Sequence, residues 1–187
     1  SAYDQAIKLT GEPKADDWFL YYARGICFER IDEWDKANAD FRMALKLNPD
    51  QPQVLNYLGY SMLEKNINLE EALSMIERAV SAVPNDGYIT DSLGWALYRL
   101  RRFDEAAKYM ERAAELMPVD PIVTDHLGDA LWAVGRKREA EFQWRRALSF
   151  EPEEKDAIRI RQKLEIGLDA VLEEEGEQPT PVAANDG

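Results

Sequence analysis

The chain has 187 residues, 45% of them hydrophobic, and its 36 acidic and 23 basic side chains give a net charge of −13. This length suits one ordinary domain or a short array of repeats, and the acidic excess argues against nucleic-acid binding, which needs clustered cations. The single cysteine, Cys27, excludes an internal disulfide, and no apolar run approaches the roughly 20 residues that a membrane-spanning helix needs.

The first residues, SAYDQAIKLTGEP, have the pattern of a helix that is already under way. We therefore expect residues 1–17 to be the remnant of a preceding repeat, and the chain to be a fragment of a longer array whose targeting signals lie outside it.

Four kinds of residue recur at intervals of 34 or 35 along the middle of the chain. The glycines are Gly25, Gly59, Gly94 and Gly128. The alanines are Ala37, Ala72, Ala106 and Ala140, then Ala44, Ala79, Ala113 and Ala147. The prolines are Pro49, Pro84, Pro118 and Pro152. One extra residue falls between the second glycine and the next alanine, which predicts a longer loop there.

A period of 34 with this residue order resembles the tetratricopeptide repeat, a helix–turn–helix unit. The resemblance covers roughly residues 18–154 and implies an all-α, right-handed solenoid of antiparallel helix pairs, each with an A helix and a B helix. The expected units are 18–51, 52–86, 87–120 and 121–154. In the first unit Arg24 stands where the other units have leucine before the glycine, which is a departure from the family's pattern.

The resemblance explains why Gly94 lies beside Trp95 inside a helix, where glycine costs about 1 kcal/mol relative to alanine. In this family the A helix must let its B helix approach closely at the glycine. The large residue of the B helix lies three positions before the last alanine of each unit. These residues are Phe41, Ile76, Met110 and Trp144.

Aspartates near the unit starts can cap the amide groups of the following helix. They are Asp17, Asp50, Asp86 and Asp120. After the last unit, residues 155–175 predict an amphipathic helix that caps the array, because solenoids need a terminal element with a polar outer face. Residues 176–187 are polar and proline-containing, and we predict that they are disordered.

The residue census argues against an enzyme. Cys27 and His126 fall in units too far apart to meet, since solenoid repeats contact only their neighbours. A metal site of His126 with Asp125 and Asp129 is the alternative considered, and solvated charges are the simpler interpretation. We expect no cofactor.

Basic residues cluster at Arg101–Arg102 and at Arg136–Lys137–Arg138, both at the end of an A helix. They suit the negative end of the helix dipole. A surface that recognises phosphate or acidic groups is the alternative.

The resemblance also places a set of residues on the inner, concave surface, where this family binds partner segments. They are Tyr22, Asn56, Tyr60, Tyr88, Asp91, Trp95, Tyr98, Arg99, Asp125, Asp129 and Trp132. Aromatic residues are favoured in binding hot spots, although some of these could instead pack between neighbouring A helices. The Lys, Asn and Arg clamp for a terminal carboxylate is missing, so the predicted partner is a protein or peptide segment with apolar and basic residues.

The segments LNYLGY, ITDSLGWALYRL and DHLGDALWAVGR are similar to a proteobacterial group of tetratricopeptide proteins that includes envelope lipoproteins acting as adaptors. That resemblance implies a periplasmic or envelope-attached protein; without it, a cytoplasmic one is expected. The predicted function is a protein-interaction scaffold. A self-associating assembly module is the alternative within binding, and a metal-dependent catalytic subunit is the alternative from another class.

Overall fold

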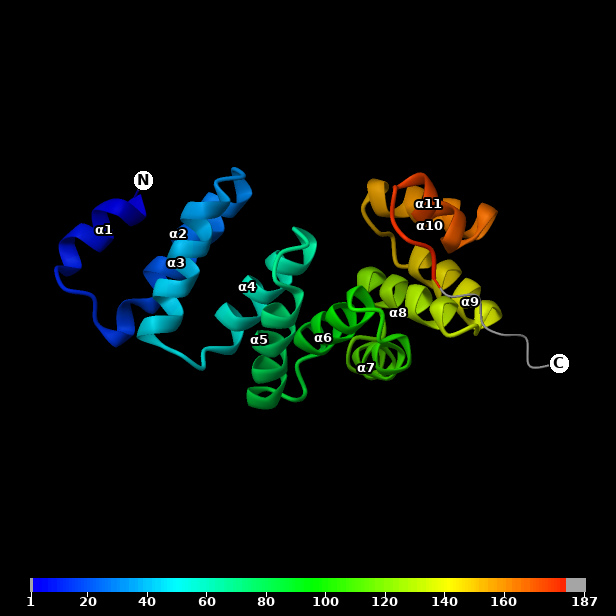
Figure 1. Ribbon diagram of the computed structural model, residues 1–187, viewed down its shortest axis with the longest axis horizontal. Helices are drawn as coiled ribbons and strands as arrows, with labels where there is room; N and C mark the ends of the chain where they lie inside the picture. Colours follow the sequence, from blue (N-terminus) through cyan, green and yellow to red (C-terminus); the bar gives the residue numbers. More distant parts are fainter. Residues whose placement is uncertain (1, 181–187) are drawn as a thin grey trace. The chain divides into compact units, whose positions relative to one another are not determined.

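The computed structural model describes residues 2–180, and its regular elements are helices (Figure 1). The chain divides into two compact units, Ser1–Val83 and Pro84–Gly187. The longest helices in residues 2–180 have 14 residues and carry charged side chains, so none of them can cross a membrane.

The first unit contains a short N-terminal helix and two helix pairs. Its elements are α1 (Ala2–Thr10), the 3-10 turn η1 (Ala15–Asp17), α2 (Trp18–Arg30), α3 (Trp34–Leu47), α4 (Pro52–Glu64) and α5 (Leu69–Ala82). Helix α2 packs against α3 and α4 against α5, while α3 also contacts α4. Each pair therefore lies within one of the expected repeats.

The second unit contains two further helix pairs and two C-terminal helices. Its elements are α6 (Gly87–Arg99), α7 (Phe103–Leu116), α8 (Pro121–Ala133), α9 (Lys137–Ser149), α10 (Glu154–Ile166) and α11 (Leu168–Glu174). The A helices α6 and α8 contact each other, and α9 contacts α10. The predicted all-α solenoid of helix pairs is confirmed.

The repeated glycines mark the closest approach of each A helix to its B helix. A Cβ atom on Gly94 would lie 2.6 Å from Cγ of Met110, and one on Gly59 would lie 2.8 Å from Cγ1 of Ile76. The side chains of the eight repeated alanines are fully buried. The packing role predicted for these columns is therefore confirmed.

The turn between the helices of each pair repeats one backbone feature. The second residue after each A helix has a left-handed conformation, with φ of 59°, 54°, 61° and 82° at Asp32, Asn66, Arg101 and Gly135. The second pair has one more loop residue than the others, and its Asn68 is also left-handed with φ of 45°. The extra residue therefore lengthens the loop, as predicted.

Arg24, which stands where the other repeats have leucine, pairs with two carboxylates. Its Nε and Nη2 each lie 2.7 Å from a carboxylate oxygen of Asp40 on the paired helix α3, and its Nη1 lies 2.9 Å from Asp4 on α1. A bidentate ion pair thus replaces the apolar contact that leucine makes in the other repeats.

Only two of the four aspartates cap helices with their side chains. Asp86 accepts a hydrogen bond from the amide of Ile89, and Asp120 accepts from Ile122 and Val123. Asp17 precedes α2 without a side-chain cap, and Asp50 instead pairs with Arg78.

The C-terminal region differs from the expected single helix followed by a disordered tail. Gly167, with φ of 83°, divides it into α10 and α11. Residues 176–180 are held by side chains of the second unit, and Thr180 is buried. The rest of the predicted disordered segment, residues 181–187, lies outside the described residues.

Candidate functional site

The inner positions of α2 and α4 form a partly exposed aromatic cluster. The ring centroids of Trp18 and Tyr22 are 6.0 Å apart, and those of Tyr22 and Tyr57 are 5.9 Å apart. Phe19, at the edge of this cluster, is 54% exposed. The predicted site residues here are Tyr22, Asn56 and Tyr60, and all three are half-buried.

In the second unit the predicted residues divide between surface and interior. Tyr88 is exposed, while Trp95, Arg99 and Trp132 are half-buried. The buried ones are Asp91, Tyr98, Asp125 and Asp129. The expectation that these acidic residues are open to a partner on the inner surface is wrong, because side chains of α8, α9 and α10 pair with them.

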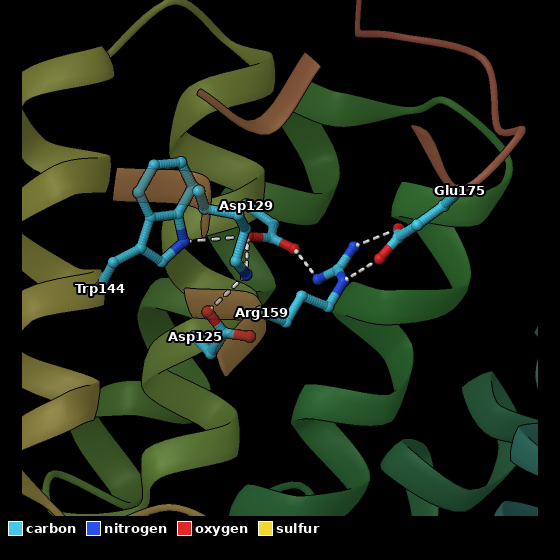
Figure 2. Close-up of polar contacts among 6 residues, drawn as sticks. Asp125, Asp129, Trp144, Arg159 and Glu175 are labelled. Atoms are coloured by element: carbon cyan, nitrogen blue, oxygen red, sulfur yellow. Dashed lines mark hydrogen bonds and ion pairs between the residues drawn. The ribbon is translucent and has the colours of Figure 1, made fainter. Parts of the chain in front are cut away.

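Asp129 lies at the centre of a buried polar network (Figure 2). Its Oδ1 accepts hydrogen bonds from Nε1 of Trp144 at 2.9 Å and from Nζ of Lys163 at 2.6 Å. Its Oδ2 lies 3.4 Å from Nη1 of Arg159, which also makes a bidentate ion pair with Glu175. Burial by itself raises the pKa of Asp129, but Lys163 and Arg159 outweigh burial and lower it.

Asp125 shares the same lysine. Nζ of Lys163 lies 2.5 Å from Oδ1 of Asp125, and the lysine side chain is fully buried. Burial and the neighbouring Asp129 carboxylate raise the pKa of Asp125, because one ammonium group cannot fully neutralise two carboxylates. The solvated charges expected at this pair are therefore an interior ion cluster.

The aromatic residues next to this network form a stack between neighbouring A helices. Trp95 stacks on Tyr98 with centroids 5.0 Å apart, and on His126 of α8 with centroids 4.4 Å apart. Nδ1 of His126 lies 2.8 Å from Oδ2 of Asp91. Burial lowers the pKa of His126, but the charge and hydrogen bond of Asp91, aided by Asp125 and Asp129, outweigh it and raise the pKa to about 9.

The inner face of this unit is covered by α11 and the residues that follow it. Nε1 of Trp132 donates to Oδ2 of Asp169 at 2.8 Å, and Thr180 donates to the other oxygen of the same carboxylate. Nη2 of Arg101, beyond the end of α6, donates to the carbonyl of Pro179 at 2.9 Å. Residues 168–180 therefore reach from α8 to the turn after α6.

Sequence reasoning missed Lys163, Arg159, Asp169 and Glu175. A signal for Lys163 existed, because Trp95, Asp129 and Lys163 are spaced at 34 and 34, so α10 occupies the phase of a fifth A helix. A cation at that phase beside Asp129 predicts an ion pair. Asp169 and Glu175 follow the break at Gly167, where the repeat period no longer places residues.

Cys27 is exposed on α2, and residues 2–180 contain no group of three or more His, Cys, Asp or Glu side chains that could hold a metal ion. In the basic turns, Arg102 pairs with Glu105, and Arg136 pairs with Glu139 and Glu111. These arginines thus have acidic partners within the chain.

Comparisons with known proteins agree with the repeated helix pairs. Two family models, both described as tetratricopeptide repeat, match residues 22–87 and 91–118, which together span half of the chain. The TPR repeat-containing protein PA4667 of Pseudomonas aeruginosa is 33% identical over 95 residues, which are 51% of this chain. The chain spans about a sixth of that relative's length, since the match covers 16% of it.

Solved structures show the same fold. The pilF protein of Pseudomonas aeruginosa has a TM-score of 0.71 at 19% identity, over 93% of this chain and 75% of its own. The thermophilic TPR protein TTC0263 of Thermus thermophilus has a TM-score of 0.68 at 21% identity, over 85% and 83%. MamA from AMB-1 has a TM-score of 0.65 at 25% identity, over 80% and 90%. Repeat columns, helix pairs and family matches thus agree: the chain belongs to the tetratricopeptide repeat family.

Proposed function

We propose that the chain is a non-catalytic protein-interaction scaffold that holds a partner segment against the inner face of its first two repeats. The observation that supports this most directly is the aromatic cluster on α2 and α4, whose edge residue Phe19 is 54% exposed. Partly exposed aromatic side chains offer large contact area and little rotamer entropy to lose, as in interface hot spots.

The partner segment is expected to be apolar. The basic residues predicted for it depended on Asp91, Asp125 and Asp129, and the structure pairs these carboxylates with His126, Lys163 and Arg159. They are therefore not free to attract a basic partner, and the remaining argument for binding is the aromatic surface.

The test uses the full chain as bait, followed by calorimetric titration with the protein recovered. Phe19→Ala should weaken binding by about 1–3 kcal/mol, as hot-spot truncations do. Leu9→Ala is the matched control, because Leu9 is an apolar residue of the same unit that is 87% exposed on α1. Equal affinity of wild type and Phe19→Ala would move the binding surface away from α2 and α4.

Self-association is the second candidate, because α11 already lies on the inner face of the second unit within one chain. The same contact between two chains would produce an assembly module. Sedimentation at increasing concentration distinguishes the two candidates, since the scaffold remains monomeric without its partner. Envelope attachment, implied by the narrower resemblance, is a separate proposal that cell fractionation of the full-length protein tests.

A further inference from the structure

The C-terminal segment of residues 168–180 contacts the second unit as a bound peptide ligand would. It contains a short helix whose Leu168, Val171 and Leu172 are buried, followed by residues that cross to Arg101. Its polar contacts are made by its own acidic side chains and carbonyl groups. We refer to residues 168–180 as the C-terminal segment.

The charges of the two surfaces are complementary. The C-terminal segment has five acidic residues and no basic residue. The surface beneath it supplies three cations: Arg159 pairs with Glu175, Arg101 donates to the carbonyls of Gln178 and Pro179, and Nζ of Lys137 lies 4.0 Å from Asp169. Two of these cations, Arg159 and Lys137, pair with carboxylates, so this surface favours acidic ligands although Asp125 and Asp129 lie within the same unit.

We expect the C-terminal segment to open more readily than the helices around it. Helix α11 has seven residues, and helices shorter than roughly 12 residues are not stable alone in water. Gly167 separates it from α10, which is itself fixed by the buried Lys163. Short terminal elements of this kind open at lower free energy than the helices of the core.

We propose that the inner face of repeats three and four is a second binding surface, for a short acidic amphipathic helix of another protein, and that the C-terminal segment occupies it until such a helix displaces it. Trp132 and the three cations recognise the ligand: Nε1 of Trp132 binds an acidic residue at the start of the helix, and Arg159 binds one at its end. This inference rests on the proposed scaffold function and adds a partner class and a regulated site.

The experiment uses the full chain and a labelled synthetic peptide with the sequence of residues 167–180 as the stand-in ligand. The double variant Val171→Asp with Leu172→Asp weakens the internal segment and leaves the surface of α6, α8 and α10 unchanged. By fluorescence anisotropy the peptide should bind this variant at least tenfold more tightly than it binds wild type.

Three controls define the site. Glu173→Gln, at an exposed position of α11, should keep the weak binding of wild type. A scrambled peptide of the same composition should bind neither chain. Adding Arg101→Ala to the double variant should weaken peptide binding several-fold, because it removes the donor to the two carbonyls.

Hydrogen exchange of the wild-type chain provides a second measurement if the double variant folds poorly. Amides of residues 168–174 should exchange at least tenfold faster than those of α8 and α9. Exchange of both only by global unfolding would overturn the proposal, and so would failure of the peptide to bind a folded double variant. If the wild type forms dimers and the double variant does not, the surface binds a second copy of this chain. That result would also overturn the proposal.

Failure of this proposal can be told apart from failure of the proposed function. Partner capture that depends on Phe19 tests the first unit, whereas peptide exchange tests the second unit. Loss of one result with retention of the other therefore identifies which proposal is wrong.

Discussion

The inner face of the first two repeats and that of the last two are built from the same repeat positions but have opposite character. In α2 and α4 these positions carry Tyr22, Asn56 and Tyr60, which are half-buried. In α8 they carry Asp125 and Asp129, which are buried and pair with side chains of α10. The repeat pattern fixes where a side chain is attached, while its exposure depends on which element packs over it.

The difference also shows two ways to place charge inside a helical repeat. The first unit has one partly buried bidentate pair, Arg24 with Asp40, between the helices of one repeat, and Arg24 also pairs with Asp4 on α1. The second unit buries a larger cluster around Lys163 that joins the last repeat to α10. The cluster of the second unit is therefore the larger and the more deeply buried of the two.

The strongest test of this comparison removes the buried ammonium group. Lys163→Ala leaves Asp125 and Asp129 without their shared cation, so we expect a loss of about 3–5 kcal/mol in the free energy of unfolding, measured with urea. Arg161→Ala is the matched control on α10, because Arg161 is exposed and pairs with Glu154, an exposed partner. Similar unfolding midpoints for both variants would show that the cluster does not anchor α10.

The second test concerns the histidine, which the first unit lacks. The pKa of His126 is raised to about 9 from an ordinary value near 6.5. Its contribution is fully present below pH 6.5 and is lost as the pH rises through about 9; it amounts to at most about 3 kcal/mol. The stability difference between wild type and His126→Gln should therefore shrink from pH 6 to pH 10.

A direct measurement supports that test. Because His126 is the chain's single histidine, its imidazole NMR signals need no assignment among several residues. A titration midpoint near 6.5 would contradict the strong coupling to Asp91. Asp91→Asn should lower the midpoint, since it removes the negative charge beside Nδ1.

The third test examines where the two units should behave alike. Gly59→Leu and Gly94→Leu should each overpack a helix pair and lower the free energy of unfolding by about 1–3 kcal/mol or more. The reason is the close approach of Ile76 and Met110. Lys108→Leu, at an exposed position of α7, should change stability little in thermal unfolding. A harmless Gly94→Leu would remove the glycine from its packing role.

The smallest effect is expected when the first repeat is converted to the pattern of the second. Arg24→Leu alone leaves Asp40 buried without its cation and should destabilise by about 1–3 kcal/mol. Adding Asp40→Met gives the first repeat the residues at the matching positions of the second, Leu58 and Met75, and should bring stability within about 1 kcal/mol of wild type. A double variant as unstable as the single one would show that the contacts of Arg24 with Asp4, or with the rings of Tyr21 and Phe28, matter more.

Much of the fold followed from the sequence because small residues at a fixed period leave few arrangements for a helix pair. The glycine and alanine columns predicted the repeats and the longer loop of the second pair. The break at Gly167 was missed because residues 155–175 keep one amphipathic pattern across it. The site was predicted less well. The position of a residue in a repeat does not show whether α10 or α11 will pack over it.

The phase of Lys163 has a consequence for engineering longer arrays. Helix α10 fits as a fifth A helix, and its recognition of the fourth repeat depends on the two carboxylates of α8 and on the indole of Trp144. A repeat inserted between α9 and α10 would have to reproduce this acidic pair, whereas one inserted between α7 and α8 would not. The capping helix α10 can thus be transferred to another array. A chimera whose last repeat carries the two aspartates and the tryptophan at the matching positions should bind it.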